Sequence, residues 1–354
     1  MAQTSRHLSL LIPGLFASTD AAHVRVTELE TLLARSEHRV CTADSDALLF
    51  ELFDLAPDGV QNPPVAPVTY ALDVNTSSGY WLRADPCYMR ADSNRVLMMG
   101  NAFLNITQYE ADTLAHELAP LFRAHDWQFS APRPKRWYLR LPADPGISWH
   151  ALSTVCGQDI HHFLPDQTTA GTGAQLWRRI LNEAQMILHQ SPVNQEREAR
   201  GELPVNSLWF WGGGALPQIS PKRFAQVWSN RALEQGLAKL FATPYAPPPL
   251  DGAIWLTQAV APGEQLVVVE PLSDTIIHCT APNHTGVGKT PIELLNQDWF
   301  APLLTALKKR ELASLHLYTG SGAVFHATPG TVARWWKRPR SFAAYQSRHA
   351  QVLK

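Results

Sequence analysis

The sequence predicts an α/β fold, in which a mainly parallel sheet flanked by helices is interrupted by a smaller inserted α+β domain. Short apolar strands alternate with helix-length amphipathic segments through most of the 354 residues, and 45% hydrophobic composition is enough for a large core. Two Pro-rich joints, at 60–68 and 130–136, bracket a segment whose pattern differs from the rest. We therefore expect a core domain formed by 1–64 and 146–354, and an inserted domain at 65–145.

The first core strand is expected in the segment LSLLI at 8–12, which ends in a Pro13-Gly14 turn. The same stretch imitates a secretory signal peptide, because Arg6 precedes an apolar run that small residues follow. A buried strand is the better interpretation, since the run is short and the turn interrupts it. The segment VTELETLLARS then predicts the first helix.

The inserted segment predicts a sheet with one long helix. We expect a capping box from Thr107 to Glu110 to open that helix. Four strands are expected here, in the segments VTYALDV, GYWLRADPCYM, RVLMMG and RWYLRL.

The rest of the core returns to alternating helices and strands. A helix with one apolar face around Trp177 precedes the strand VNSLWFWG, in which Trp209 and Trp211 should face one side and Phe210 the other. Gly212 to Gly214 are expected to form the loop after that strand. The strand QLVVVEP, a helix capped by the box Thr290-Pro291-Ile292-Glu293 and the strand ASLHLYTG complete the sheet.

Composition excludes several classes of function. With 30 Lys and Arg against 31 Asp and Glu, the chain has no overall field that would draw it to nucleic acid or an anionic membrane. The four cysteines are scattered without paired spacing, so neither a disulfide framework nor a cysteine zinc site is indicated. No segment has the roughly 20 apolar residues of a membrane span. We expect a cytoplasmic protein.

Local motifs give weaker signals. Asp274 and His278 have the i, i+4 spacing of a metal-binding pair, although a surface hydrogen bond is the commoner explanation. The segment NHTGVGKT at 283–290 imitates a P-loop, which we reject because the first glycine is missing and the helix starts too late, but Lys289 could still contact a phosphate. The basic and aromatic C-terminal segment 334–354 is compatible with binding a partner, whereas a solvated basic terminus is commoner.

The order of these motifs resembles the archaeal-type, cofactor-independent phosphoglycerate mutases of the alkaline phosphatase superfamily. The matching segments run through most of the chain, and the Asn-Arg helix with the Trp-Gly strand is the most specific of them. They are ADSDALLFELFDL, GYWLRAD, GQDIHHFLP, HQSPVNQEREARGELPVNSLWFWGGG and LVVVEPLSDTIIH. The resemblance implies an alkaline phosphatase-like core domain with an inserted domain.

The resemblance also implies roles for individual residues. Ser45 falls where the family has its phosphorylated serine, and Asp274 and His278 fall on a pair of metal ligands. Five residues fall in segments that surround the substrate in the family: Arg83, Asp85, Asn194, Arg197 and Asn206.

Several departures from the family pattern affect the metal ligands. The first strand should end in Asp-Gly but ends in Pro13-Gly14, and a late strand should end in Asp-His but ends in Thr319-Gly320. Trp335 and Trp336 stand near the position of a last metal histidine. Phosphoryl transfer through a serine in this family needs two metal ions, and too few ligands are left to hold them.

We therefore expect a pseudoenzyme. It would bind a small phosphorylated or anionic metabolite, or a protein partner, in the cleft that corresponds to the active site of the family. Arg83, Arg197 and Arg200 would hold the anion, although salt bridges to neighbouring glutamates explain Arg200 equally well. No cofactor is expected except at most one weakly bound divalent ion, Mn²⁺, Mg²⁺ or Zn²⁺.

Two alternatives stay open. One is an active phosphoglycerate mutase or phosphotransferase that uses Ser45 with metal ligands recruited from Asp44, Asp46 or His326. The other is an interaction protein that binds a partner through residues 337–354, with nucleic acid the less expected partner.

Overall fold

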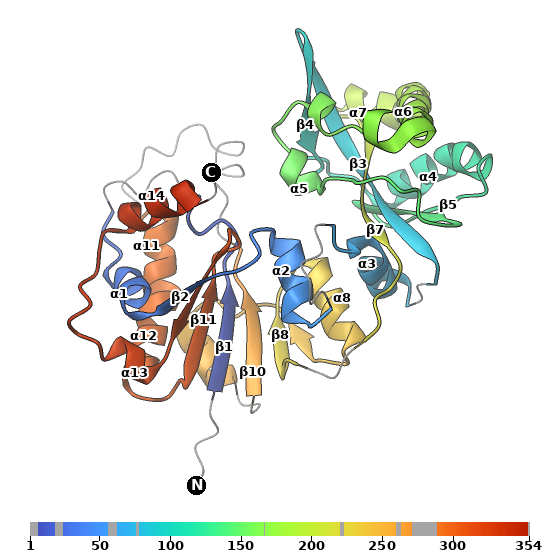
Figure 1. The fold of residues 1–354 in the computed structure, drawn as a ribbon. Helices are drawn as coiled ribbons and strands as arrows, with labels where there is room; N and C mark the ends of the chain where they lie inside the picture. Colours follow the sequence, from blue (N-terminus) through green and yellow to red (C-terminus); the bar gives the residue numbers. More distant parts are fainter. Residues whose placement is uncertain are drawn as a thin grey trace. The chain divides into compact units, whose positions relative to one another are not determined.

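The computed structural model describes residues 6–17, 24–55, 62–75, 78–165, 167–219, 223–259, 263–270 and 289–352, without the side chains of 167–172 and 349–352. The chain divides into two compact units (Figure 1). Unit 1 comprises Met1–Gly59 and Ile219–Lys354, and unit 2 comprises Val60–Gln218. We had predicted an inserted domain at 65–145, and the compact unit 2 continues well beyond residue 145.

Unit 1 contains a seven-stranded sheet in the order β2-β12-β11-β1-β10-β8-β9. The five strands from β11 to β9 run parallel, whereas β12 and β2 are antiparallel additions at one edge. The mainly parallel sheet is therefore confirmed. Its strands are β1 (Arg6–Leu11), β2 (Glu37–Val40), β8 (Gln226–Trp228), β9 (Tyr245–Ala246), β10 (Gly263–Val268), β11 (Ser314–Tyr318) and β12 (Ala323–Ala327).

Helices cover this sheet, and one large apolar core lies beneath them. Leu8 and Leu10 of β1 pack into that core with Phe300 and Leu303, whereas Phe53, at the end of α2, packs on Phe224 with ring centroids 5.2 Å apart. The helices of unit 1 are α1 (Thr27–Arg35), α2 (Ser45–Leu52), α8 (Ala232–Leu240), α9 (Gly252–Gln258), α11 (Pro291–Leu295), the π-helical turn η3 (Asn296–Phe300), α12 (Ala301–Lys308), α13 (Pro329–Val332) and α14 (Phe342–Val352).

Unit 2 is built on a five-stranded antiparallel sheet with helices. Its strands are β3 (Tyr80–Asp92), β4 (Arg95–Gly100), β5 (Gln128–Arg133), β6 (Arg136–Leu141) and β7 (Ser207–Gly214). Its helices are α3 (Val65–Val74), α4 (Gln108–Arg123), α5 (Leu152–Val155), the 3₁₀ turn η2 (Ile160–His162), α6 (Gln167–Gln190) and α7 (Pro192–Ala199). Trp177 of α6 packs on Phe210 of β7, with ring centroids 4.9 Å apart, in the core of this unit.

Strand β7 is the main correction to the predicted topology. We expected VNSLWFWG to join the parallel core sheet, but β7 pairs antiparallel with β3, so that Phe210 lies opposite Ala84. Figure 1 shows these two strands side by side. Strand β3 is long enough to pair with β4, β6 and β7. Pairing with β3 therefore places β7 in the sheet of unit 2. The apolar sequence of β7 fits either sheet, since both would bury it on two faces.

The segment VTYALDV is a second correction, because it forms helix α3 and not a strand. Its β-branched residues favoured a strand. The buried positions Val65, Val68 and Thr69 instead follow helical spacing, and Asn75 ends the helix in a left-handed conformation. Tertiary packing therefore outweighs local propensity here.

Both predicted capping boxes are present. The Thr107 hydroxyl accepts from the Glu110 amide at 3.2 Å, and the Glu110 carboxylate accepts from the Thr107 amide at 2.8 Å. The same reciprocal pair joins Thr290 and Glu293. The segment at 8–12 forms most of the central strand β1, in agreement with the predicted buried strand.

Cys41, Cys87 and Cys156 are free thiols. Within the described residues, every helix is too short or too polar to cross a lipid bilayer.

Candidate functional site

The carboxyl ends of the central strands in unit 1 form the candidate site, which we call the Ser45 edge. It comprises Pro13 and Gly14 after β1, Ser45 at the start of α2, and Thr319 and Gly320 after β11. The Gly14 amide donates to the Thr319 carbonyl at 3.1 Å, and the Ser45 hydroxyl lies 3.4 Å from the Gly320 carbonyl. The segments that the resemblance assigned to catalysis and metal binding thus meet in space, at the edge where parallel sheets bind ligands.

The side chains at the Ser45 edge are packed against one another. Gly320 has φ of +65°, and a Cβ atom there would lie 2.7 Å from Ser45 Oγ and 2.8 Å from Pro13 Cα. Both distances are shorter than real Cβ contacts, and the positive φ disfavours any side chain. Only glycine fits this position, so Ser45 and Pro13 occupy the space that a ligating side chain would need.

One arginine provides the positive charge beside this edge. Arg231, which follows β8, lies 3.0 Å from Asp46, 3.2 Å from Glu234 and 3.7 Å from Glu270. Glu234 is fully buried, and burial raises its pKa to about 7 although Arg231 opposes the shift. Three carboxylates therefore share one guanidinium, which leaves little positive charge for an anionic ligand.

The alternative metal ligands have other roles in the structure. The Asp44 carboxylate caps α2 by accepting from the Ala47 amide at 2.7 Å, and Asp46 pairs with Arg231. The His326 ring stacks on His316 with centroids 4.3 Å apart, and burial together with His326 lowers the pKa of His316. The structure does not bring these side chains together as a ligand set.

Two of the predicted site residues cannot be placed. Asp274 and His278 lie outside the described residues. Lys289 is exposed and contacts the Gln297 side chain. Among the residues that the structure describes, no group of three or more His, Cys, Asp or Glu side chains could hold a metal ion.

Arg83 and Asp85 form a buried pair in unit 2. Arg83 Nη2 lies 2.6 Å from Asp85 Oδ1, and the Trp211 indole donates to Asp85 Oδ2 at 2.8 Å. The Arg83 guanidinium also lies over the rings of Tyr138 and Trp211, at 5.3 and 5.2 Å from their centroids. Both residues are at most 6% exposed, so these contacts hold β3 to β6 and β7.

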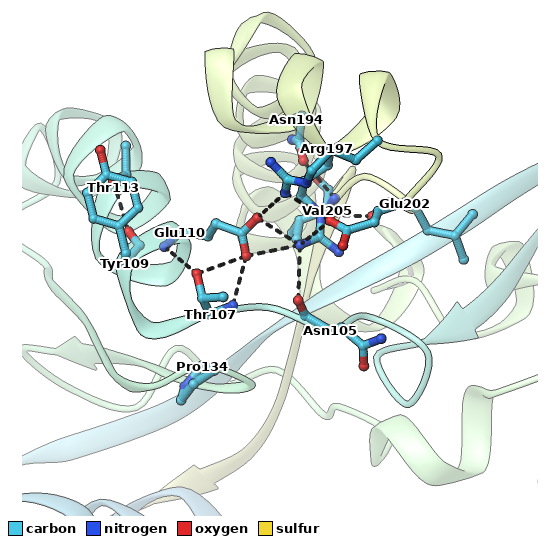
Figure 2. Close-up of polar contacts among 12 residues, drawn as sticks. Asn105, Thr107, Tyr109, Glu110, Thr113, Pro134, Asn194, Arg197, Glu202 and Val205 are labelled. Atoms are coloured by element: carbon cyan, nitrogen blue, oxygen red, sulfur yellow. Dashed lines mark hydrogen bonds and ion pairs between the residues drawn. The ribbon is translucent and has the colours of Figure 1, made fainter.

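Arg197 lies at the centre of a second buried network, which we call the Arg197 network (Figure 2). Its Nη1 atom lies 3.1 Å from both carboxylate oxygens of Glu110, and its Nε atom donates to the Leu203 carbonyl at 3.0 Å. Arg200 reaches the same carboxylate at 2.8 Å from a half-exposed position and also pairs with Glu202. The salt-bridge interpretation of Arg200 agrees with these contacts.

The electrostatics of the Arg197 network favour an ionised Glu110. Burial alone would raise the pKa of this carboxyl, but hydrogen bonds from the backbone and hydroxyl of Thr107, together with Arg197, lower it. Arg197 is 1% exposed. The network therefore joins the first turn of α4 to α7 and the loop that follows it.

The two asparagines join backbone segments. The Asn194 amide donates to the carbonyls of Leu188 and Val205 at 2.8 and 2.7 Å, and its oxygen accepts from the Val205 amide. Asn206 forms a similar two-way pair with the backbone of Met89. All five residues that the resemblance assigned to the substrate thus form hydrogen bonds or ion pairs within unit 2. Their contact with a ligand stays a prediction.

The three glycines of β7 have a packing role. We had predicted that Gly212 to Gly214 form a loop after the strand. The structure places them within the strand. A Cβ at Gly212 would lie 3.0 Å from Val65, and one at Gly214 would lie 2.5 Å from Pro64. The glycines therefore let the start of α3 approach the strand, while Trp209 and Phe210 fill opposite faces as expected.

Two contributors to these sites were missed at the level of the sequence. Glu110 was recognised as a helix cap, but its pairing with Arg197 joins positions 87 residues apart. Arg231 was not singled out. Its place directly after a strand and at the start of α8 is the signal that could have found it.

Comparison with known proteins gives several distant matches. No protein-family profile matches the chain. The probable 2,3-bisphosphoglycerate-independent phosphoglycerate mutase of Geobacter sulfurreducens is 33% identical over 66 residues, which are 19% of this chain and 16% of that protein. The 2,3-bisphosphoglycerate-independent phosphoglycerate mutase of Methanosarcina barkeri is 22% identical over 203 residues, or 54% of this chain and 50% of that protein. The chain thus matches half or less of the length of these relatives.

A solved structure supports the fold over a longer span. The PH0037 protein from Pyrococcus horikoshii superposes with a TM-score of 0.52 at 14% identity, covering 93% of this chain and 88% of that chain. At this identity the match concerns the fold alone. The sequence matches show that the chain is similar, over part of its length, to cofactor-independent phosphoglycerate mutases, from which it has diverged.

Proposed function

We propose that the protein is a non-catalytic relative of cofactor-independent phosphoglycerate mutase, which binds a small phosphorylated or anionic metabolite without transferring a phosphoryl group. In this proposal unit 1 has the alkaline phosphatase-like layout, with the cleft that corresponds to the active site of the family at the Ser45 edge. The close packing of Gly320 against Ser45 and Pro13 is the observation that carries the proposal.

The residues at the Ser45 edge do not fit the two-metal centre that the family resemblance implies. Pro13 has no ligating side chain, and Gly320 has none and cannot be given one without moving Ser45 or Pro13. Of the nearby carboxylates, Asp44 caps α2 and Asp46 is paired with Arg231. A serine hydroxyl without a metal ion or a neighbouring base is a poor nucleophile, so we expect no phosphoenzyme at Ser45.

Binding without catalysis is compatible with the same geometry. The Ser45 hydroxyl and the start of α2 can contact the anionic part of a metabolite. Arg231 supplies positive charge, but three carboxylates share it. We therefore expect weak binding at this edge, with affinity that falls as the negative charge of the ligand rises.

The test combines metal content with turnover. Protein purified without chelator, and again after dialysis against Mn²⁺, Mg²⁺ or Zn²⁺, is analysed for metal and assayed with 3-phosphoglycerate, beside the Ser45→Ala and Asp274→Ala variants. We expect no stoichiometric metal and no turnover in any sample. Turnover that disappears in Ser45→Ala, with close to two metal ions per chain that are lost in Asp274→Ala, would show an active mutase and overturn the proposal.

Calorimetric titration with 3-phosphoglycerate tests the binding half of the proposal. Weak binding by the wild type that Ser45→Ala reduces is the expected result. Binding that is equal in both proteins would place the metabolite elsewhere and remove the Ser45 edge as its site.

A further inference from the structure

A cavity of about 700 Å³ lies in unit 1, and its lining includes none of the residues of the Ser45 edge. It is bounded by the end of α1, the edge strand β2, its neighbour β12, and the C-terminal segment that contains α14. Its volume falls within the range of roughly 300 to 1,000 Å³ that is typical of pockets for small ligands. We call it the C-terminal pocket.

Aromatic rings form part of the lining of the C-terminal pocket. Phe16, Phe325, Tyr345 and His38 all contribute to its walls. The Phe16 and Phe325 rings meet edge to face with centroids 6.1 Å apart, and the His38 ring lies 4.9 Å from Phe325. Such walls favour a flat ring, because offset and edge-to-face contacts add to the burial of apolar area.

Cations also line the same pocket. Lys337, Arg338, Arg340 and Arg348 are among its lining residues, against a single lining carboxylate, Glu37. Glu37 already pairs with Arg334 at 3.4 Å. Within the described part of the chain, no carboxylate forms an ion pair with any of the four cations. In a chain with a net charge of −1, four cations that have no ion pair among the described residues thus line one pocket.

The C-terminal segment is held in place by contacts with the core. Phe342 is fully buried, and its amide donates to the carboxylate of Glu30 in α1 at 3.1 Å. The Gln346 side chain donates to the Phe16 carbonyl at 3.1 Å. These contacts hold the segment that carries the cations beside the pocket, unlike a freely solvated tail, and reduce the backbone entropy lost when a ligand binds.

We propose that the C-terminal pocket binds a planar aromatic anion with the chemistry of a nucleoside phosphate. The ring lies among Phe16, Phe325 and Tyr345, and the phosphate faces Lys337, Arg338 and Arg340. Guanidinium groups suit this role because they form paired, charge-assisted hydrogen bonds with phosphate oxygens. The proposal does not depend on whether Ser45 transfers a phosphoryl group.

The first experiment measures the affinity for AMP by calorimetry in wild type and in a Lys337→Gln/Arg338→Gln/Arg340→Gln variant. We expect at least about tenfold weaker binding in this variant, from the loss of three charged contacts. The control Arg90→Gln/Arg95→Gln/Arg179→Gln removes the same charge from exposed positions of unit 2 and should bind AMP as wild type does. Equal affinity in the two triple variants, or no binding of AMP by wild type at millimolar concentration, would overturn the proposal.

A second experiment separates the ring from the phosphate. Adenosine and inorganic phosphate should each bind more weakly than AMP, and Tyr345→Leu should weaken AMP but not inorganic phosphate. Inorganic phosphate that binds as tightly as AMP would refute the aromatic half of the assignment. Circular dichroism and the midpoint of thermal unfolding are measured for each variant, and a variant that does not fold is replaced by its single substitutions.

Discussion

Replacement of Arg197 by alanine should destabilise unit 2 strongly. Arg197 is 1% exposed, and the change removes two contacts of 3.1 Å with Glu110 and leaves the Leu203 and Asn105 carbonyls without this donor. Removing one partner of a buried ion pair typically costs about 3–5 kcal/mol of unfolding free energy. Because Arg200 still pairs with Glu110, we expect the lower end, about 3 kcal/mol.

Arg200→Ala is the matched control, since Arg200 pairs with the same carboxylate from a half-exposed position. An exposed pair contributes about 0–1 kcal/mol, so this variant should stay close to wild type. The double variant should lose more than the sum of the two single changes, because Glu110 then has neither arginine. Equal losses from Arg197→Ala and Arg200→Ala would refute the argument that burial decides the magnitude.

The assay has to report on unit 2 alone, since two compact units need not unfold together. Native-state hydrogen exchange of the β7 amides under increasing urea meets this need.

The dependence of stability on acid gives an independent check. The pKa of Glu110 is lowered in the fold, so its contribution is complete above the unfolded pKa and disappears as the pH falls through the folded pKa. The difference between wild type and Arg197→Ala should therefore shrink in acid.

Three further changes have defined outcomes. Gly212→Ala should lower the unfolding free energy by about 1–2 kcal/mol in urea titrations, because φ is +63° and the new methyl group would lie 3.0 Å from Val65; a neutral result would refute the proposed close approach. Glu234→Gln should flatten the decrease in stability between about pH 4.5 and pH 7, where the unfolded state ionises first because burial raises the folded pKa to about 7; an unchanged slope in thermal melts would contradict that shift. Asp73→Asn should destabilise more at pH 7 than at pH 3, because bonds from Arg136 and Tyr138 outweigh burial and lower the pKa of Asp73; equal losses at the two pH values would refute this.

Local rules predicted the elements of the fold that depend on neighbouring residues. The capping boxes at Thr107 and Thr290 and the strand that precedes Pro13 were predicted correctly, because each depends on contacts within a few positions. Strand β7 was assigned to the wrong sheet, since its apolar sequence fits a central strand of either one. The strand that β7 pairs with depends on the length of β3, and this pairing joins residues more than 100 positions apart.

For the candidate site, too, some features could be predicted from the sequence, whereas those that depend on distant residues could not. The resemblance brought Pro13, Ser45 and Gly320 to one edge, and the structure agrees. The charges beside that edge were missed, because the pairing of Arg231 with Asp46 joins distant segments with no common motif. Truncation of residues 337–354 would test partner binding, but it would also remove the buried Phe342. Neutralising surface cations is therefore the cleaner test.

In the proposed function, the replacements of metal ligands at the Ser45 edge depend on one another. A histidine at Gly320 would need φ of +65° and would meet Ser45 Oγ at its first side-chain atom, so the ligand could enter only if α2 or the turn after β1 moved. Pro13 fixes its own φ and removes an amide donor, which makes that turn less able to move. Each replacement thus stabilises the packing that the others produce, and restoring one ligand alone would cost stability without completing a metal site. In the proposed function, this coupling keeps the Ser45 edge filled by Ser45 and Pro13, so that no metal site forms there.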